Sequence, residues 1–357
     1  MANVGDKTRF GIFSPVSGIK KNVPIILTLT PDNMNVQLKD GKIIRRRMRK
    51  ATLLNAETKV QTPDANPIIR YHTFIKRSTG TQYVLAFTKA HIYLWNTATF
   101  AFDTKFTCSA NCENWETVNY NDKVVATNNV DKVLVWDTTG NFVALDDTTN
   151  GIEYSTGVYL TKAKYVTTFE NYLILGYTYE SGASYPQRVR WNDIGDETNW
   201  LTGNKGSVEI GQADKITGFG HYQGFLIIFK ETSHYKVWLV GVPYIFNALQ
   251  LSNKVGCQCS GSIINDSKGR LYWYSSEGTF KEITAGTISD DIQTDIVAKI
   301  EPDSVELIKS VFLDNTEEVC WSIPYSNTLN NLLIIFKEGK WLLVDLAIPA
   351  FGSYKET

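Results

Sequence analysis

Short runs of apolar, β-branched and aromatic residues recur from about residue 69 onward, and clusters of Gly, Asn, Asp or Ser separate them. The runs come in six pairs, and equivalent positions within the pairs are Leu85, Val125, Leu173, Leu226, Leu271 and Val319. Successive positions are 40, 48, 53, 45 and 48 residues apart. Because a four-stranded propeller blade takes about 40–50 residues, the sequence predicts an all-β fold, a six-bladed β-propeller with an extended N-terminal arm.

Each pair of runs also contains a tryptophan, and these are Trp95, Trp136, Trp191, Trp238, Trp273 and Trp321. Large aromatic side chains at matching depths are what adjacent blades need in order to pack sheet against sheet. A β-sandwich would show shorter spacing and fewer units. The Trp-Asp signature of one propeller class occurs once, at Val135–Asp137, so the repeat is a structural rhythm and not a repeated sequence.

The rhythm predicts two domains, an arm over residues 1–68 and a propeller over residues 69–357. Within the arm, "TPDNMNV" and "KDGKIIRR" predict two strands joined by an Asp-Gly hairpin turn. Residues 290–301 depart from the strand pattern, because three isoleucines four residues apart predict a short helix there. The last blade has three candidate closing strands, "KIIRRR" and "TKVQT" from the arm and "KWLLVDL" from the C-terminal end.

The charge balance is nearly neutral, with 36 basic and 37 acidic residues and a formal net charge of −1. Such a balance argues against general avidity for nucleic acid or for an anionic membrane. The first ten residues are polar and carry no signal-peptide core. The longest apolar runs, "VPIILTLT" and "NLLIIF", are far shorter than the ~18 residues that a membrane helix needs. We therefore expect a soluble protein made in a cytoplasm, with no membrane partner.

Five cysteines are present, Cys108, Cys112, Cys257, Cys259 and Cys320. An odd count without a secretory signal predicts reduced thiols. The pairs Cys108/Cys112 and Cys257/Cys259 could together supply a four-thiolate zinc site, but neither pair has the two-residue knuckle spacing of such sites. Small buried apolar residues are the favoured interpretation.

No catalytic residue, metal ligand or cofactor site is predicted. None of the four histidines lies in a metal-ligand pair or beside a marked nucleophile, and His91 and His234 fall in strand patterns that predict a structural role. A Gly-rich phosphate loop is absent. A hydrolase is the enzyme-class alternative, although the repeated Ser-x-Asp-x-Gly turns of sialidase-like propellers are missing.

One charge run stands out, formed by Arg45, Arg46, Arg47, Arg49 and Lys50. It could contact DNA phosphates in or beside a channel. The favoured alternative is a solvated strand, or ion pairs with a neighbouring subunit. A nearly neutral protein with one basic arm suits a ring that touches its neighbours and guides DNA only loosely.

The stretch "PQRVRWNDIGDETNW" at residues 186–200 combines aromatic, basic and acidic residues, and those of interest are Arg188, Arg190, Trp191, Asp193, Gly195, Asp196 and Trp200. We expect the first tryptophan to end a blade strand and the second to fold back over the blade edge, with the acids and glycine shaping the turn between them. We expect the two arginines to share one strand face and to pair with Asp193, Asp196 or Glu197. This arrangement predicts a packing clasp. The alternative is an aromatic-plus-acid pocket that binds sugars.

Three motifs resemble, in the same order, segments of phage virion propellers, the packaged-DNA stabilisation and tail-nozzle (head–tail connector) proteins of short-tailed phages. The first is "DNMNV" followed by "DGKIIRR" in the arm, and the second is "RVRWNDIGDETNW" at Arg188–Trp200. The third is "ISDDIQTDI" at Ile288–Ile296, followed by "CWSIPYSN" at Cys320–Asn327. The likeness covers most of the chain, but over residues 69–160 only the strand rhythm agrees.

The resemblance implies a non-enzymatic structural protein of the virion tail or neck, made in the host cytoplasm. It implies a ring of six copies that retains packaged DNA and forms part of its exit channel during genome ejection. The partners would be other copies of the chain, a portal or adaptor protein, and DNA through loose, non-specific contacts. A carbohydrate-binding or glycan-cleaving propeller for host-surface recognition is the alternative, since 18 tyrosines and 9 tryptophans could stack on sugars. A cellular peptide-binding scaffold is disfavoured by the missing blade signatures.

Overall fold

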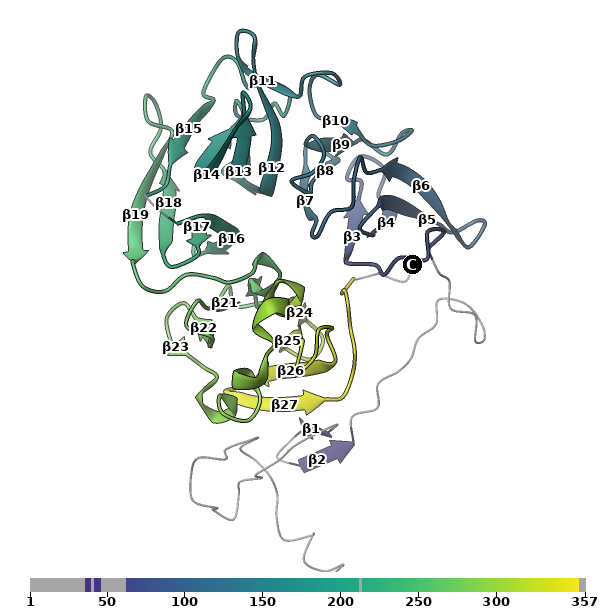
Figure 1. Ribbon diagram of the computed structural model, residues 1–357, viewed down its shortest axis with the longest axis vertical. Helices are drawn as coiled ribbons and strands as arrows, with labels where there is room; N and C mark the ends of the chain where they lie inside the picture. Colours follow the sequence, from purple (N-terminus) through teal and green to yellow (C-terminus); the bar gives the residue numbers. More distant parts are fainter. Residues whose placement is uncertain (1–35, 40–41, 46–61, 212–213, 353–357) are drawn as a thin grey trace, which may run out of the picture. The chain divides into compact units, whose positions relative to one another are not determined.

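The computed structural model describes residues 36–39, 42–45, 62–211 and 214–352. The fold is all-β, a six-bladed β-propeller in which six antiparallel sheets follow one another along the chain (Figure 1). Four of the sheets belong to one compact unit, over residues 62–260 and 349–352, and two belong to a second unit, over residues 261–348. Each sheet is an up-and-down meander, which is the blade organisation that the spacing predicts.

The four-sheet unit contains strands β3 to β19. The first sheet has β3 (Arg70–Ile75), β4 (Gln82–Phe87), β5 (His91–Asn96) and β6 (Ala101–Thr107). The second has β7 (Glu116–Tyr120), β8 (Lys123–Thr127), β9 (Leu134–Trp136) and β10 (Val143–Ala144). The third has β11 (Ile152–Ser155), β12 (Val158–Phe169), β13 (Tyr172–Glu180), β14 (Ala183–Trp191) and β15 (Gly206–Glu209). The fourth has β16 (Ile216–Tyr222), β17 (Phe225–Lys230), β18 (His234–Leu239) and β19 (Phe246–Ser252).

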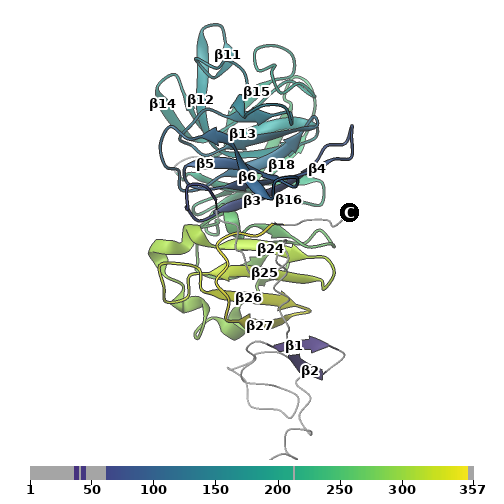
Figure 2. The ribbon, with the colours of Figure 1, turned by 90° about the vertical axis from the view of Figure 1, so that its right-hand side faces the viewer.

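The two-sheet unit contains the fifth and sixth sheets. The fifth has β20 (Ile264–Asn265), β21 (Leu271–Tyr274), β22 (Phe280–Glu282) and β23 (Gly286–Thr287). The sixth has β24 (Lys309–Leu313), β25 (Glu318–Ile323), β26 (Leu332–Lys337) and β27 (Lys340–Val344), which lie in this order across the sheet (Figure 2). Short 3-10 turns over Asp290–Ile292, Val297–Lys299 and Pro302–Leu307 connect the two sheets.

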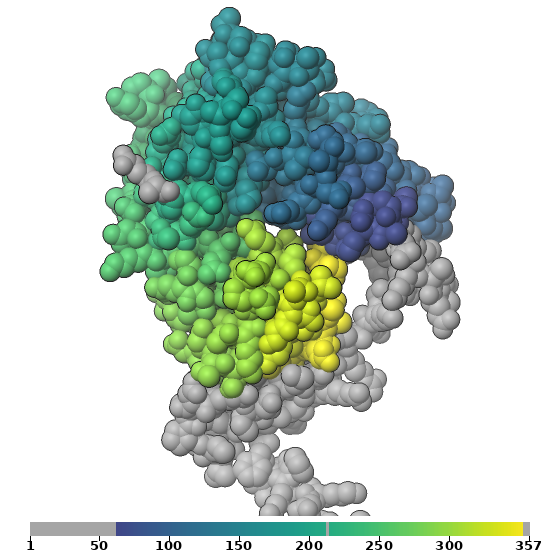
Figure 3. Space-filling view, viewed as in Figure 1, coloured from purple at the N-terminus to yellow at the C-terminus, as the bar shows by residue number. Residues whose placement is uncertain are grey.

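The six equivalent positions of the sequence repeat all lie on corresponding strands. Each falls on the second strand of a four-stranded blade, namely β4, β8, β13, β17, β21 and β25, and all six side chains are buried. The third sheet has five strands, because β11 is an additional edge strand beside β12; the four-stranded blade is β12 to β15, and β13 is its second strand. The third sheet also has the longest strands, and its hairpins project beyond the neighbouring sheets of the unit (Figure 3). The predicted rhythm is therefore confirmed.

The six tryptophans do not all occupy the same strand of their blades, so they match one another less closely than predicted. Four of the six lie on the third strand of a four-stranded blade, with β11 left out of the third sheet, but Trp273 and Trp321 lie on the second strand. In the sixth sheet the indole of Trp321 instead packs 4.8 Å from the ring of Phe280 and 5.8 Å from that of Trp341. A large ring can fill the space between two sheets from either middle strand, so the sequence position of a tryptophan does not fix its strand.

The predicted helix over residues 290–301 is wrong. Ile292, Ile296 and Ile300 are buried, as their spacing indicated, but the segment forms two separate 3-10 turns. The segment ends in an extended conformation, with a ψ of 128° at Ile300, where the backbone forms an antiparallel β-bridge with Tyr325. Tertiary pairing therefore overrides the helical period.

The predicted arm hairpin is confirmed, because β1 (Val36–Lys39) pairs antiparallel with β2 (Lys42–Arg45) across a two-residue connection. The sixth sheet takes its four strands from consecutive segments, and its last strand lies within the C-terminal candidate "KWLLVDL". The candidate "TKVQT" lies outside the described residues except for Thr62. No helix in the described part of the chain is long and apolar enough to cross a membrane.

Candidate functional site

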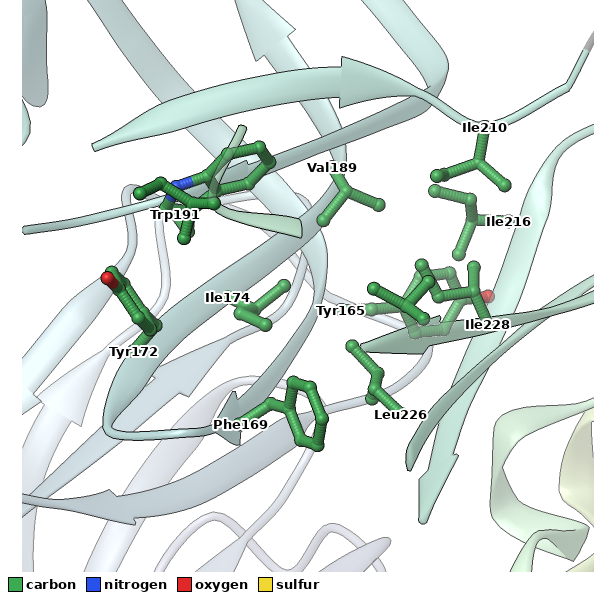
Figure 4. Packing of buried hydrophobic residues seen from close by; sticks show 12 residues of the cluster. Tyr165, Phe169, Tyr172, Ile174, Val189, Trp191, Ile210, Ile216, Leu226 and Ile228 are labelled. Atoms are coloured by element: carbon green, nitrogen blue, oxygen red, sulfur yellow. The ribbon is translucent and has the colours of Figure 1, made fainter. Parts of the chain in front are cut away.

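The stretch at residues 186–200 wraps around one end of the third sheet. Trp191 is the last residue of β14, as predicted, and it packs among side chains of the third and fourth sheets. Figure 4 shows it in the same cluster as Ile174 and Leu226. Trp200 lies on the opposite face of the third sheet, where it packs with Leu173 and with Val125 of the second sheet. The two indoles therefore fill the spaces on both sides of one blade.

The turn between the tryptophans is held by its own acids. The Asp193 carboxylate accepts a hydrogen bond of 2.7 Å from the Asn204 backbone N–H. The Asp196 carboxylate accepts two from Thr198, one from its backbone N–H and one from its hydroxyl. Gly195 has a φ of +75°, a conformation that favours glycine, and its N–H donates to the Asn171 carbonyl. These bonds fix the turn as the sequence indicated.

Polar contacts also join this turn to the second sheet. The Glu197 carboxylate lies 2.5 Å from the Lys123 ammonium and accepts a bond of 2.8 Å from the Asn121 side chain. The buried Asn192 side chain donates to the Tyr120 hydroxyl at 3.2 Å. Because Tyr120, Asn192 and Glu197 are buried, these bonds specify one arrangement of two neighbouring sheets.

The predicted partners of the two arginines are wrong. Neither arginine pairs with the acids of the turn; both pair with Glu180 at the end of β13. Arg190 donates to Glu180 through two nitrogens, at 3.1 and 2.7 Å, and Arg188 donates at 2.9 Å. Arg188 also pairs with Glu209 on β15. The turn acids instead have other donors: backbone N–H groups bind Asp193 and Asp196, and the Lys123 and Asn121 side chains bind Glu197. Glu180 is fully buried, where a charge needs a partner.

Aromatic rings pack against both arginines of the charge network around Glu180. The guanidinium of Arg190 stacks 3.7 Å from the ring of Tyr154, and that of Arg188 stacks 3.7 Å from the ring of Tyr185. Burial by itself would raise the pKa of Glu180, but hydrogen bonds from Arg190 and Thr178 outweigh it, so the pKa lies below its ordinary value. Glu180 is therefore a structural anion and holds no proton to donate near neutral pH.

The alternative interpretation of the stretch as a sugar pocket needs an exposed aromatic surface. Both tryptophan side chains are buried, and their indole N–H groups donate to the carbonyls of Asn204 and Glu197. Trp200 is 1% exposed and Trp191, which lines an apolar groove, is 6% exposed, so neither indole presents a broad open face to a sugar ring.

The basic run of the arm lies almost wholly outside the described residues. Arg45 is the last residue of β2. Arg46, Arg47, Arg49 and Lys50 lie outside the described part of the chain, so contact with DNA or with a neighbouring subunit stays a prediction.

The cysteines form no disulfide, and all but Cys108, which is half-buried, are buried. Within the described residues, no group of three or more His, Cys, Asp or Glu side chains could hold a metal ion. His91 and His234 begin strands β5 and β18, as predicted, and each has an imidazole nitrogen near an oxygen, that of Asp64 at 2.9 Å and that of Val255 at 2.7 Å.

A polar hollow of about 440 Å³ lies at one end of the inner strands of the four-sheet unit. Tight hairpin turns with positive φ at both central residues form part of its wall, Asn121–Asp122 in the second sheet and Glu170–Asn171 in the third. The Asp122 carboxylate accepts the backbone N–H groups of Arg77 and Ser78, which ties the first sheet to the second. Sequence analysis did not predict this hollow, because its residues are ordinary turn residues.

Two histidines near this hollow lie on inner strands, His72 on β3 and His221 on β16. His221, which lines it, lies 3.1 Å from the Thr167 hydroxyl, and desolvation lowers the pKa of its imidazole. His72 on β3 lies 2.7 Å from the Asn119 amide oxygen, and desolvation lowers its pKa to about 4. The His72 imidazole is therefore uncharged at neutral pH, and both imidazoles serve as hydrogen-bonding groups.

An apolar groove of about 300 Å³ lies between the third and fourth sheets. Its floor includes Trp191 and Val237, and its sides come from the outer strands β15 and β19. Near its wall residues Ile210 and Tyr235, the fully buried Lys230 ammonium donates to the Ile210 carbonyl at 2.7 Å and pairs with Asp214 at 2.6 Å. The only charged side chain that lines the groove within the described residues is Glu209.

No family model and no curated protein sequence matches the chain. Among solved structures, it is similar to BamB from Moraxella catarrhalis, with 8% identity over 81% of this chain and 78% of that one and a TM-score of 0.42. It is also similar to Hsv2 from Kluyveromyces lactis, with 11% identity over 78% of this chain and 97% of that one and a TM-score of 0.39.

A third similar structure is the extracellular domain of a putative hybrid two-component system from B. thetaiotaomicron. The identity is 10% over 75% of this chain, the TM-score is 0.44, and the chain spans only 33% of that protein. Likenesses this distant carry no argument about function.

Proposed function

We propose that the chain is a non-enzymatic structural protein of a phage virion, a propeller that assembles into a ring in the tail or neck. In that position it would help to retain packaged DNA and form part of the channel through which DNA leaves. Its work is mechanical, because a rigid wall of blades resists deformation while the arm contacts a neighbouring subunit, a portal or an adaptor.

One observation carries the proposal: two of the three motifs that resemble the virion propellers lie where neighbouring sheets of the scaffold meet. The segment Arg188–Trp200 fills the spaces on both faces of the third sheet. The segment Ile288–Ile296 buries Ile292 and Ile296 beside the fifth and sixth sheets, and Cys320–Ile323 lies within β25. A shared motif that builds a scaffold supports a shared mechanical role.

The state of the buried charges also supports a mechanical role. Glu180 and Lys230 are fully buried, and each is committed to paired partners in the same unit. A catalytic acid or base needs a pKa near the working pH and access to a substrate. These two groups have neither the access nor an unpaired position, so they stabilise packing.

The test is to look for the protein in virions. We expect antibodies against the purified chain to label the tail or neck of virions in electron micrographs, and peptides of the chain to appear when purified virions are digested. Absence from virions, together with a chain that stays monomeric in the presence of neck proteins, would contradict the proposal. Binding of the purified chain to a glycan array would favour the host-surface alternative instead.

A further inference from the structure

The outer edge of the fourth sheet has none of the usual protection against pairing with another strand. Among the described residues, strand β19 forms a ladder with β18 on one side only, and its sequence "FNALQLS" contains no charged residue and no proline. Sheets commonly protect an outer strand with charges, or by making it very short. The other outer strands of this unit follow that rule: β6 contains Asp103 and Lys105, β15 contains Glu209, and β10 has two residues.

Apolar side chains accompany this open edge. Leu249 and Leu251 on β19 are 52% and 43% exposed. The loop that leads into β19 exposes Val242 and Tyr244 at 76% and 77%. Exposed apolar side chains gathered in one place mark an interaction surface.

The apolar groove adjoins the same strand. Phe246 and Ala248 of β19 form one side, and Val208 of β15 forms the other. A strand that added to β19 could therefore place alternate side chains over the groove, because successive side chains of a strand point to opposite faces. Backbone pairing with side-chain pockets is the chemistry by which extended segments bind sheet edges.

The chain itself contains a segment of matching character. Residues 23–30, "VPIILTLT", carry no charge and are rich in β-branched residues, and they lie in the 35 residues that precede β1. Eight extended residues span about 26 Å, which matches the seven-residue β19 at about 3.3 Å per residue. Lys20 and Lys21 precede the segment, and Glu209, the only charged side chain among the described residues that line the groove, pairs with Arg188 and is 57% exposed. The two lysines are therefore opposite in charge to the one charged group of the groove.

We propose that residues 23–30 of a neighbouring copy add as a strand to the outer edge of β19 and cover the groove between the third and fourth sheets. The inference rests on the proposed ring, since an arm that binds the outer edge of the next copy makes a head-to-tail contact that repeats around an axis. The basic run follows residues 23–30 in the same arm, so it would be held near the neighbouring subunit.

Photo-crosslinking in the full-length chain tests the inference. A benzoylphenylalanine replaces Ile26, and copies labelled with ¹⁴N and ¹⁵N are mixed before irradiation so that mass spectrometry separates crosslinks between copies from those within one. We expect crosslinks between copies to residues 246–252 or 206–209. Crosslinks confined to one copy, or directed elsewhere, would overturn the inference.

Matched variants keep the test independent of folding. Ala248→Arg places a long cation in the groove and should reduce the intercopy crosslink at least tenfold. Leu329→Arg, at an exposed leucine that does not line the groove, should leave it unchanged. Thermal melting identifies a variant that fails to fold, and Val208→Arg, at an exposed residue that lines the groove, then replaces it. Equal crosslinking in the groove variants and the control would overturn the inference.

The two proposals fail in different ways. A chain found in virions without the crosslink to β19 would refute this contact and leave the structural role standing. The crosslink in a chain that is absent from virions would do the opposite.

Discussion

At the scale of single residues, Glu180 is one of the fully buried charged groups of the described structure. It is fully buried and pairs with two arginines, so its loss would leave two guanidinium groups without their shared anion. Removing one partner of a buried pair costs about 3–5 kcal/mol. We therefore expect Glu180→Gln to lower the free energy of unfolding by about that amount, measured by urea denaturation.

The matched control is Glu209→Gln, since Glu209 pairs with Arg188 from an exposed position. Exposed pairs contribute at most about 1 kcal/mol. Equal losses for the two variants would show that burial around Glu180 does not set the strength of its ion pairs.

The same residue predicts how stability depends on pH. The pKa values of Glu180 and Glu197 are both lowered in the folded chain, because bonds from Arg190 and Lys123 outweigh the effect of burial. A lowered carboxyl pKa contributes stability that is complete above the ordinary value of 4.5 and is lost as the pH falls through the folded value. We expect the free energy of unfolding to fall below about pH 4.5, and to fall less steeply in Glu180→Gln.

At the scale of structural elements, the turn over residues 191–200 positions two tryptophans on opposite faces of one sheet. Trp200→Ala would leave a cavity between the second and third sheets, and such changes cost about 3–5 kcal/mol. We expect a correspondingly lower urea midpoint, with a small effect from Leu201→Ala, whose side chain is exposed. An unchanged midpoint in Trp200→Ala would refute the interpretation of this turn as a packing clasp.

The strands that the sequence predicts well are the two middle strands of each sheet. They are covered on both faces, so their apolar residues form nearly continuous runs, as in β17 with "FLIIFK". Outer strands lack this signal, since β10 and β23 have two residues each and β15 is mostly exposed. The additional strand β11 has no counterpart in the repeat, so nothing in the rhythm predicts it.

The candidate clasp was predictable in its aromatic residues and not in its ion pairs. Trp191 follows a strand-type run, which indicates a strand end, and Gly195 between two acids indicates a turn. Glu180 precedes Ser-Gly and therefore resembles an exposed turn acid. Glu180 on β13 binds two arginines of β14. The pairing of these two strands contains a register shift between Gly176 and Thr178, and such a shift cannot be derived from the sequence alone.

At the scale of the whole molecule, six consecutive meanders make the fold stiff. The contacts within the described residues require no metal, disulfide or cofactor. A chain of 357 residues buries about three quarters of its unfolded surface, so its packing alone can support the fold. Stiff blades with an unprotected outer strand suit a repeating assembly better than an isolated monomer.

The most direct measurement of this account is a cryo-electron microscopy reconstruction of the purified full-length protein at concentrations where it assembles. We predict a closed ring with a mass near six times the 40.2 kDa of one chain, in which each subunit shows six blades and extra density covers the outer edge of β19. Single particles of one chain at every concentration, with and without neck proteins, would contradict it.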